Sequence, residues 1–285
     1  MDVYKQTKDI LKKYNIHANK NLGQNFLIDS NIIDSIIGSS NITGQDLVIE
    51  IGPGLGTLTE SLLEKAYKVI CIELDKKMVN ILHERFEKYD NIEILNEDIL
   101  KVDLNKLIKE QRQKGEFEKV KIVANLPYYI TTPIIMKLLE NNLDIYSITI
   151  MVQLEVAERI CAIPGDNKCG AITYCIYYYS QTEEIINVPN SSFIPEPKVI
   201  SKVVKLKLRD RPAVEVKDKK LLFNLIKAAF SKRRKTLQNA LLNSDLFASK
   251  DQIIQILNKL NIDEKIRGEK LTLEQYAQIC NLISE

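Results

Sequence analysis

Histidine is scarce in this chain: only His17 and His83 occur among 285 residues. Two histidines so far apart in sequence argue against a histidine-based metal site and against a Ser-His catalytic triad. The five cysteines include no C-x-x-C pair and are odd in number, so neither a disulfide framework nor a zinc site is expected. We expect reduced, mostly buried thiols and no bound metal.

Long apolar runs are also missing. No stretch approaches the roughly 20 apolar residues that a membrane helix needs. Lysines interrupt the N-terminal region where a signal peptide would place its apolar core, at Lys5, Lys8, Lys12 and Lys13. The composition, with 45% hydrophobic and 27% charged residues, is that of an ordinary globular protein. We expect a cytoplasmic, monomeric protein that does not contact a membrane.

Charge is distributed unevenly along the chain. The formal net charge is only +2, yet residues 198–240 hold 14 Lys and Arg against 3 Asp and Glu, so the remainder is net acidic. A solvated helix face would not require so lopsided a split. A basic segment on an acidic protein is typical of a surface that meets a polyanion. The distribution favours nucleic acid as a partner.

Short runs rich in Val and Ile alternate with amphipathic stretches from about residue 30 onward. This rhythm is typical of βαβ units and predicts an α/β fold, a mostly parallel sheet of about seven strands with helices on both faces. The predicted strands are Leu47–Ile51, Lys68–Leu74, Ile92–Asn96, Val120–Asn125, Tyr146–Val152, Glu183–Val188 and Ser201–Leu208. The predicted helices among them are Thr57–Lys65, Lys76–Lys88, Thr132–Asn141 and Ile172–Ser180, although the last run also fits a strand.

A different pattern follows the linker-like segment 209–212. Helical periodicity extends over Lys219–Leu242, Lys250–Leu260 and Thr272–Ile283, and the last begins with the Thr-x-x-Gln spacing of a capping box. The sequence therefore predicts a sheet domain over residues 1–209 and a small all-α domain over residues 210–285.

A cluster of four cations lies within the first of these helical stretches. It consists of Lys232, Arg233, Arg234 and Lys235, and we predict it to lie on a helix whose other face is apolar. Such a face is usually only solvated. Because it belongs to the most basic segment of the chain, we expect these side chains to contact RNA phosphates, which would make binding salt-dependent.

A glycine loop, Gly52-Pro53-Gly54-Leu55-Gly56, closes the first strand of the predicted sheet. Glycines at this point let the chain turn sharply and let a ligand approach the main chain, with Gly52 and Gly54 as the candidate contacts. Glu73 ends the next strand, where a carboxylate can accept hydrogen bonds from both ribose hydroxyls. The third glycine comes one residue too early for a dinucleotide fingerprint, and no P-loop Lys-Ser/Thr follows. S-adenosylmethionine fits this pattern better than a nucleotide phosphate.

Asp98 follows the third strand and supplies another carboxylate at the same edge. It could accept the amino group of the cofactor's adenine, while the backbone N–H of Ile99 reaches a ring nitrogen. Taken alone, Asp98 fits a helix cap better than a ligand contact. A glycine loop and two acids at three successive strand ends favour a binding site, because such sheets bind ligands at that edge.

The segment Asn125-Leu126-Pro127-Tyr128 follows the fourth strand. If the Asn125 amide oxygen and the Leu126 carbonyl each accept a hydrogen bond from an adenine amino group, the nitrogen lone pair is freed from the ring. Pro127 makes this turn rigid, and Tyr128 offers an aromatic face on which an extruded base can stack. An isolated match would suggest only a proline turn with core tyrosines. Its place after a sheet strand predicts methyl transfer to an exocyclic base nitrogen, driven by positioning and electrostatics.

Nearly the whole chain resembles the rRNA adenine N6,N6-dimethyltransferases, in particular those of the bacterial small ribosomal subunit. The resemblance rests on residues 21–27 (NLGQNFL), the loop 50–56, residues 72–75 (IELD), the motif 125–129 (NLPYY), residues 193–199 (FIPEPKV) and residues 229–237 (AFSKRRKTL). It implies a Rossmann-like methyltransferase fold with S-adenosylmethionine as cofactor. It also implies that Asn25 and Leu27 contact the cofactor together with Gly52, Glu73, Asp98 and Asn125, and that Phe193 packs on the target base opposite Tyr128.

The resemblance further implies methylation of two adjacent adenosines in the 3′-terminal hairpin of small-subunit (16S) rRNA, and a link to late subunit assembly. The family commonly has Asp-Ser after the Lys-Val of residues 198–199, where this chain has Ile200-Ser201. We expect that difference to alter a local hydrogen bond rather than the chemistry.

Two alternatives stay open at the level of sequence. A large-subunit (23S) rRNA methyltransferase of the antibiotic-resistance type would share the cofactor and amino-group motifs, although residues 229–237 and 266–271 (IRGEKL) resemble the small-subunit group. An assembly factor with dispensable catalysis is an alternative of another class, and the sequence does not rank the two roles.

Overall fold

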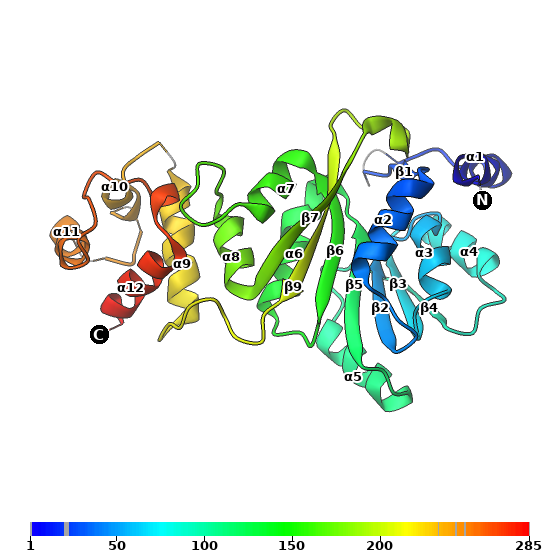
Figure 1. The fold of residues 1–285 in the computed structure, drawn as a ribbon, viewed down its shortest axis with the longest axis horizontal. Helices are drawn as coiled ribbons and strands as arrows, with labels where there is room; N and C mark the ends of the chain where they lie inside the picture. The colour runs from blue at the N-terminus through cyan, green and yellow to red at the C-terminus, as the bar shows by residue number, and fades with distance from the viewer. Residues whose placement is uncertain (1, 20–22, 233, 243, 248, 285) are drawn as a thin grey trace. The chain divides into compact units, whose positions relative to one another are not determined.

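The structure is a computed structural model that describes residues 2–19, 23–232, 234–242, 244–247 and 249–284. Its first half contains α1 (Val3–Lys13), β1 (Phe26–Leu27), α2 (Ser30–Ser40), β2 (Asp46–Ile51), α3 (Thr57–Leu63), β3 (Lys68–Glu73), α4 (Lys76–Arg85), β4 (Ile92–Asn96), α5 (Leu104–Lys114), β5 (Lys119–Asn125), η2 (Tyr128–Ile130) and α6 (Thr131–Glu140). Its second half contains β6 (Ser147–Gln153), α7 (Leu154–Cys161), α8 (Ala171–Tyr179), β7 (Ser180–Val188), η3 (Asn190–Ser192), β8 (Phe193–Ile194), β9 (Ser201–Leu208), α9 (Lys219–Ser231), α10 (Leu237–Leu241), α11 (Lys250–Lys259), η4 (Gly268–Lys270) and α12 (Leu273–Ile283). Figure 1 shows these elements along the chain.

The chain divides into two compact units. One combines residues 1–157 with 182–208, and the other combines residues 158–181 with 209–285. The predicted division after residue 209 lies next to the boundary at Leu208, whereas residues 158–181, placed by sequence in the first domain, group with the helical unit. The reason is that α8 contributes Tyr174 and Tyr178 to the apolar core of that unit.

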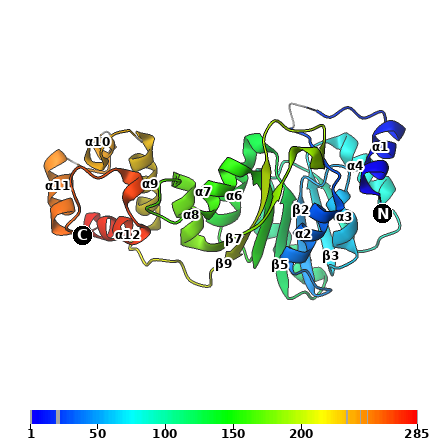
Figure 2. The ribbon, with the colours of Figure 1, turned by 45° about the horizontal axis from the view of Figure 1, so that its top comes forward.

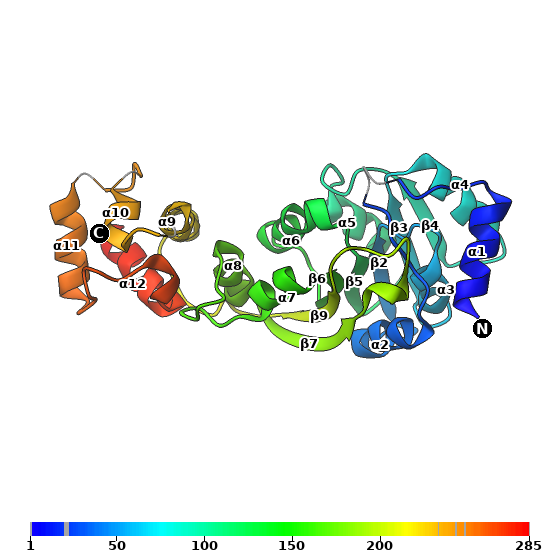
Figure 3. The same cartoon turned by 90° about the horizontal axis from the view of Figure 1, so that it is seen from above.

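A seven-stranded sheet of order β4-β3-β2-β5-β6-β9-β7 forms the first unit. The pairs from β4 to β6 are parallel, and β9 pairs antiparallel with β6. All seven predicted strands are therefore confirmed, with ends that differ by at most three residues. Helices α2, α3 and α4 contribute to the apolar cluster on one face of the sheet, and Figure 3 shows α5 and α6 on the opposite face.

The helical unit has its own core, formed by α8 to α12 (Figure 2). Tyr174 and Tyr276 are fully buried there, and their hydroxyls donate to the carbonyls of Leu271 and Gly268 at 2.6 and 2.9 Å. The predicted capping box of α12 is confirmed, since Thr272 and Gln275 exchange hydrogen bonds between side chain and backbone. The run taken as a helix near residues 172–180 is also confirmed, as α8.

The prediction of one continuous helix over Lys219–Leu242 is wrong. Helix α9 ends at Ser231 and α10 begins at Leu237. The backbone N–H of Leu237 donates to the Ile266 carbonyl at 2.7 Å, and its side chain is completely buried. This tertiary contact takes the chain out of the helix.

Four of the five cysteines are buried, as predicted. Within the described residues, no helix is both long and apolar enough to cross a membrane. The same residues contain no group of three or more His, Cys, Asp or Glu side chains that could hold a metal ion.

A buried ion pair joins β2 to β5 at the edge where these strands begin. Lys121 Nζ lies 2.7 Å from Asp46 Oδ2, and their side chains are 5% and 2% exposed. Asp46 also accepts hydrogen bonds from the N–H and hydroxyl of Thr43 at 2.8 and 2.9 Å. Burial raises the pKa of Asp46, but the bonds from Lys121 and Thr43 outweigh burial and hold it below its ordinary value.

We expect Lys121→Met to lower the free energy of unfolding by about 3–5 kcal/mol, because it leaves the buried Asp46 carboxylate without its cation. Urea denaturation measures this loss. Lys106→Met is the matched control, because Lys106 pairs with Glu110 at the exposed surface of α5, where the expected effect is below about 1 kcal/mol. Equal, small effects at both lysines would contradict the argument.

Candidate cofactor and base site

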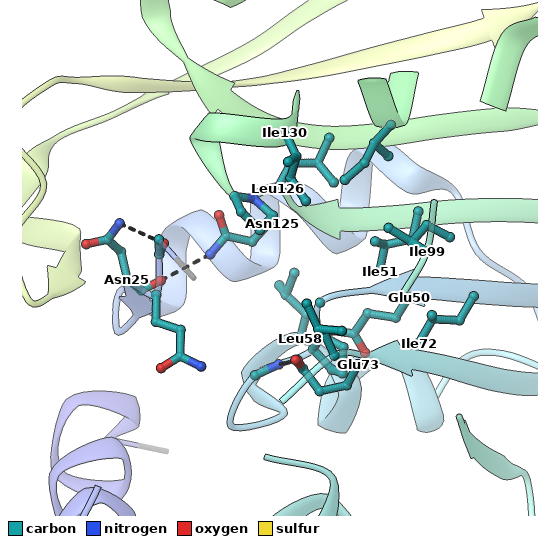
Figure 4. Close-up of a pocket in the computed structure, with 18 of the residues that line it drawn as sticks. Asn25, Glu50, Ile51, Leu58, Ile72, Glu73, Ile99, Asn125, Leu126 and Ile130 are labelled. Atoms are coloured by element: carbon teal, nitrogen blue, oxygen red, sulfur yellow. Dashed lines mark hydrogen bonds between the residues drawn. The ribbon is translucent and has the colours of Figure 1, made fainter. Parts of the chain in front are cut away.

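One cavity lies at the edge of the sheet where β2, β3 and β5 end (Figure 4). It holds about 1050 Å³ of empty space, its open mouth included. It brings together the predicted site residues Asn25, Leu27, Gly52, Gly54, Glu73, Asp98, Ile99, Asn125, Leu126, Pro127 and Tyr128. These residues come from segments up to about 100 positions apart, so the fold alone makes them neighbours.

The three glycines of the loop have two different structural roles. Gly52, Gly54 and Gly56 all have positive φ, at 67°, 58° and 82°, which disfavours any side chain. Gly52 and Gly54 line the cavity, whereas Gly56 turns toward α4, where a Cβ would come within 2.5 Å of the Phe86 ring. The first two glycines therefore open the backbone to a ligand, and the third lets α3 begin close to α4.

Glu73 is held against the glycine loop. Its two carboxylate oxygens accept hydrogen bonds from the backbone N–H groups of Gly54 and Asp75, at 3.0 and 2.9 Å. The side chain is only 7% exposed, and burial raises its pKa although these bonds oppose the rise. Because each carboxylate oxygen can accept two hydrogen bonds, Glu73 keeps acceptor capacity for a ribose diol.

Asp98 closes the turn that follows β4 and also lines the cavity. Its Oδ1 accepts a hydrogen bond from the Leu100 N–H at 2.9 Å within a turn, whereas the helix cap that the sequence suggested for Asp98 is provided by Asp103, at the start of α5. The backbone of this turn is further tied by the N–H groups of Lys101 and Val102, which donate to the Asp98 carbonyl. A fixed turn presents the Asp98 carboxylate and the Ile99 backbone to the cavity together.

The segment before β1 forms one wall of the cavity. Gln24 Nε2 donates to Asp75 Oδ2 at 2.9 Å, and Gln24 Oε1 accepts from the Asn19 N–H at 2.9 Å. Strand β1 then pairs with β8, with Phe26 opposite Ile194. Asn21 and Leu22 of the quoted motif lie outside the described residues. Sequence reasoning missed the part played by Gln24, although this residue lies inside the motif, because its partner Asp75 is 51 positions away.

Asn125 has a defined amide orientation. Its Nδ2 donates to the Asn25 carbonyl at 3.3 Å, so its acceptor oxygen Oδ1 faces away from that carbonyl (Figure 4). The next backbone group, the Leu126 N–H, donates to the Met151 carbonyl of β6 at 3.2 Å. The amide and the start of the motif are thus fixed by two separate parts of the fold.

Tyr128 begins the short helix η2 on the far side of Pro127. The Pro127 carbonyl accepts hydrogen bonds from the Ile130 N–H and the Thr131 hydroxyl at 3.2 and 3.1 Å, which fixes the turn. Tyr128 Oη lies 2.7 Å from Ser201 Oγ, and burial raises the pKa of Tyr128. The neighbouring Tyr129, which sequence reasoning did not single out, lines the same cavity and is 55% exposed.

Phe193 is not among the residues that line the cavity. It begins β8, pairs with Leu27, and is 1% exposed within the apolar cluster on the α2 face of the sheet. Its predicted packing on a base opposite Tyr128 stays a prediction.

Of the predicted cation cluster, Lys232, Arg234 and Lys235 are not on a helix, contrary to the prediction. Lys232 follows the last residue of α9, and the Lys235 N–H donates to its carbonyl at 2.8 Å in a turn. Arg233 lies outside the described residues. Lys232, Arg234 and Lys235 are exposed, so the turn presents their charges to solvent.

Glu50 is a buried acid at the base of the cavity. It is 1% exposed, and its Oε2 accepts hydrogen bonds from Thr59 Oγ1 at 2.6 Å and Cys71 Sγ at 3.7 Å. Burial raises the pKa of Glu50 from 4.5 to about 7. Near neutral pH its charge is therefore only partly developed, while its hydrogen bonds connect β2 to α3 and β3.

This raised pKa makes the stability of the fold depend on pH. Between pH 4.5 and 7 the folded protein holds a proton on Glu50 that the unfolded chain has lost, so stability falls as pH rises. We expect Glu50→Gln, which needs no proton, to remove about 3 kcal/mol of this loss. The measurement is the free energy of unfolding at pH 5 and pH 8 for both proteins. The exposed Glu64→Gln is the control, and identical pH slopes in all three proteins would show that Glu50 ionises freely.

Nearly the whole chain is similar to proteins of one known family. The family model described as ribosomal RNA adenine dimethylase matches residues 15–285. Proteins named ribosomal RNA small subunit methyltransferase A from Alkaliphilus oremlandii and Clostridioides difficile are 48% and 47% identical, over 99% and 98% of this chain and 97% and 95% of theirs.

Two solved structures resemble this chain in fold. A dimethyladenosine transferase from Plasmodium falciparum has a TM-score of 0.74 and 30% identity, over 89% of this chain and 95% of that one. The 23S rRNA methyltransferase ErmE, at 23% identity over 92% of this chain and 100% of that one, has a TM-score of 0.68 and shares the fold. With a family match over most of its length and relatives near half identity, this chain belongs to the ribosomal RNA adenine dimethylase family.

Proposed function

We propose that this protein transfers methyl groups from S-adenosylmethionine to N6 of two adjacent adenosines in the 3′-terminal hairpin of small-subunit rRNA, giving N6,N6-dimethyladenosine. The observation that carries the proposal is the meeting of Asn125 and Tyr128 with the glycine loop, Glu73 and Asp98 in one cavity. The names of the relatives at 47–48% identity support the small subunit as the source of the RNA. The large-subunit alternative rests on a likeness of fold alone.

The donor set of the cavity fits S-adenosylmethionine. Glu73 offers carboxylate oxygens to the ribose, and the exposed backbone at Gly52 and Gly54 leaves room for the amino-acid part of the cofactor. The Asp98 carboxylate and the Ile99 N–H would take the adenine edge, with Asn25 and Leu27 closing the wall. The cofactor, when bound, supplies an electrophilic methyl group on a sulfonium.

The protein's part in the reaction is to hold the acceptor nitrogen. Asn125 Oδ1 and the Leu126 carbonyl accept the two N6–H bonds of adenine, which draws the nitrogen toward tetrahedral geometry and frees its lone pair. Tyr128 stacks on the base and keeps it extruded from the RNA. Positioning and fixed dipoles supply the rate enhancement, so the site requires no strong general base.

The RNA contacts of the helical unit are proposed from charge. Lys232, Arg234 and Lys235 lie in an exposed turn and, with Arg233, would bind phosphates and set the orientation of the RNA rather than read its bases. A monomeric state, a cytoplasmic location and a role in subunit assembly stay predictions.

The deciding experiment incubates the protein with labelled S-adenosylmethionine and under-methylated small subunits, with large subunits in parallel, and maps the modified bases. We expect dimethyladenosine at two adjacent positions near the small-subunit 3′ end. Label found only in large-subunit RNA would overturn the assignment of small-subunit rRNA as substrate, while the assignment of the methyl-transfer reaction would stand. Cofactor binding without methyl transfer to either subunit would overturn both the proposed substrate and the proposed reaction, and would favour an assembly role.

We expect Asn125→Ala to lower kcat by about 10²–10³-fold, the loss seen when a fixed transition-state hydrogen-bonding group is removed. Single-turnover methyl transfer measures it, and thermal denaturation checks the fold. Asn105→Ala is the matched control. Asn105 is an exposed residue of α5 outside the cavity, and its side-chain amide donates to the Asn141 carbonyl. Full activity in Asn125→Ala would remove the amide from the mechanism.

We expect the triple variant Lys232→Ala/Arg234→Ala/Lys235→Ala to bind rRNA more weakly and with a flatter salt dependence. Each lost phosphate contact lowers the slope of log K against log [salt] by about 0.7–0.9. Filter binding at several salt concentrations gives this slope. The triple variant Lys250→Ala/Lys259→Ala/Lys265→Ala removes equal charge from exposed positions of the same unit, and equal slopes in the two variants would contradict a specific role for the turn.

A further inference from the structure

Ser201 is a polar residue in a core position. It is the first residue of β9, it is completely buried, and it faces the same side of the strand as the buried Val203. A buried hydroxyl destabilises a core unless it is hydrogen-bonded. Its recorded partner is the hydroxyl of Tyr128, at 2.7 Å and 73 positions away in sequence. The serine therefore links the interior of the sheet to the aromatic ring of the site.

The backbone around Ser201 is fixed from both sides. Ser201 pairs with Gln153 at the end of the antiparallel β6–β9 ladder, and the carbonyl of Ile200 accepts a hydrogen bond from the Leu154 N–H at 3.0 Å. Ile200 itself is 47% exposed, so the residue that departs from the family's usual aspartate points to solvent while the serine stays inside. The Ser201 hydroxyl is consequently a fixed point rather than a mobile one.

Tyr128, in contrast, has only two side-chain torsions to set the plane of its ring. Its backbone end is held by the Pro127 turn, and its far end by the bond to Ser201. Because Oη lies on the axis through Cβ and Cγ, a ring that is held at both ends keeps the direction of that axis, whereas a ring that is held at one end can swing about its first torsion. Stacking and methyl transfer both depend on the position of the ring, because a base must lie over the ring that supports it.

We propose that Ser201 is a positioning residue that holds the Tyr128 ring in its place beside the target adenine. This inference rests on the proposed function, in which Tyr128 stacks on that base. It assigns the serine to the turnover step more than to RNA affinity, because phosphate contacts elsewhere dominate affinity.

The test compares Ser201→Ala, Tyr128→Phe and the double variant in single-turnover methyl transfer to small-subunit RNA. Each single change removes the same hydrogen bond, and both variants retain the aromatic ring at position 128. We expect each to lower kcat about three- to tenfold, with KM for RNA and for cofactor nearly unchanged. The double variant should be no slower than the slower single variant, since the bond is lost only once.

A spectroscopic readout separates positioning from a merely structural role. A hairpin RNA with 2-aminopurine at the target adenosine reports stacking by loss of fluorescence, and we expect Ser201→Ala to quench less than the wild type. Ser147→Ala is the control, because Ser147 is 1% exposed at the other end of the same β6–β9 ladder. A Ser201→Ala protein that is less stable yet equals the wild type in kcat and quenching would overturn the proposal. A wild-type protein without transfer to small-subunit RNA would instead overturn the proposed function.

Discussion

The parallel register of β3, β2 and β5 is the constraint on which the site depends. Ile51 pairs with Ile72 on one side and with Ala124 on the other, so the glycine loop, Glu73 and Asn125 all follow aligned positions at one edge. Successive side chains of a strand point to opposite faces, so a slip of one residue would turn Asn125 away from the cavity. The apolar strands and their buried ion pair at the opposite edge thus hold the catalytic geometry as well as the fold.

The polar groups of the site are arranged so that little charge meets the acceptor nitrogen. Glu73 is tied to backbone N–H groups on the cofactor side, and burial raises the pKa of Glu50 to about 7. The groups nearest the proposed target are an amide, a carbonyl and a phenol. Although four acids also line the cavity, neutral groups at the proposed acceptor suit a reaction in which a neutral amine attacks a cationic methyl donor, because the attacking lone pair has only to be aligned and exposed.

The sequence was sufficient for the strands and for the edge of the sheet where the cavity lies, because strand ends and glycine turns are local signals. Eleven of the predicted site residues line that cavity, nine of them predicted from such signals and Asn25 and Leu27 from the resemblance. It failed where distant contacts decide. The helix over residues 219–242 breaks because Leu237 bonds to Ile266, and residues 158–181 join the helical core through Tyr174 and Tyr178. The pairing of Phe193 with Leu27 is likewise a distant contact that no pattern within residues 193–199 reveals, and the predicted packing of Phe193 on a base stays a prediction.

Contacts between residues far apart in sequence also join the cofactor half of the site to the base half. The Asn25 carbonyl holds the Asn125 amide, while Gln24, one residue earlier, holds Asp75 beside Glu73. One short segment therefore contacts the group that presents the base and the turn that would bind the ribose. A change in the position of this segment would therefore affect both the Asn125 amide and the turn at Asp75. The order in the site thus comes from the segment before β1 as much as from the motif after β5.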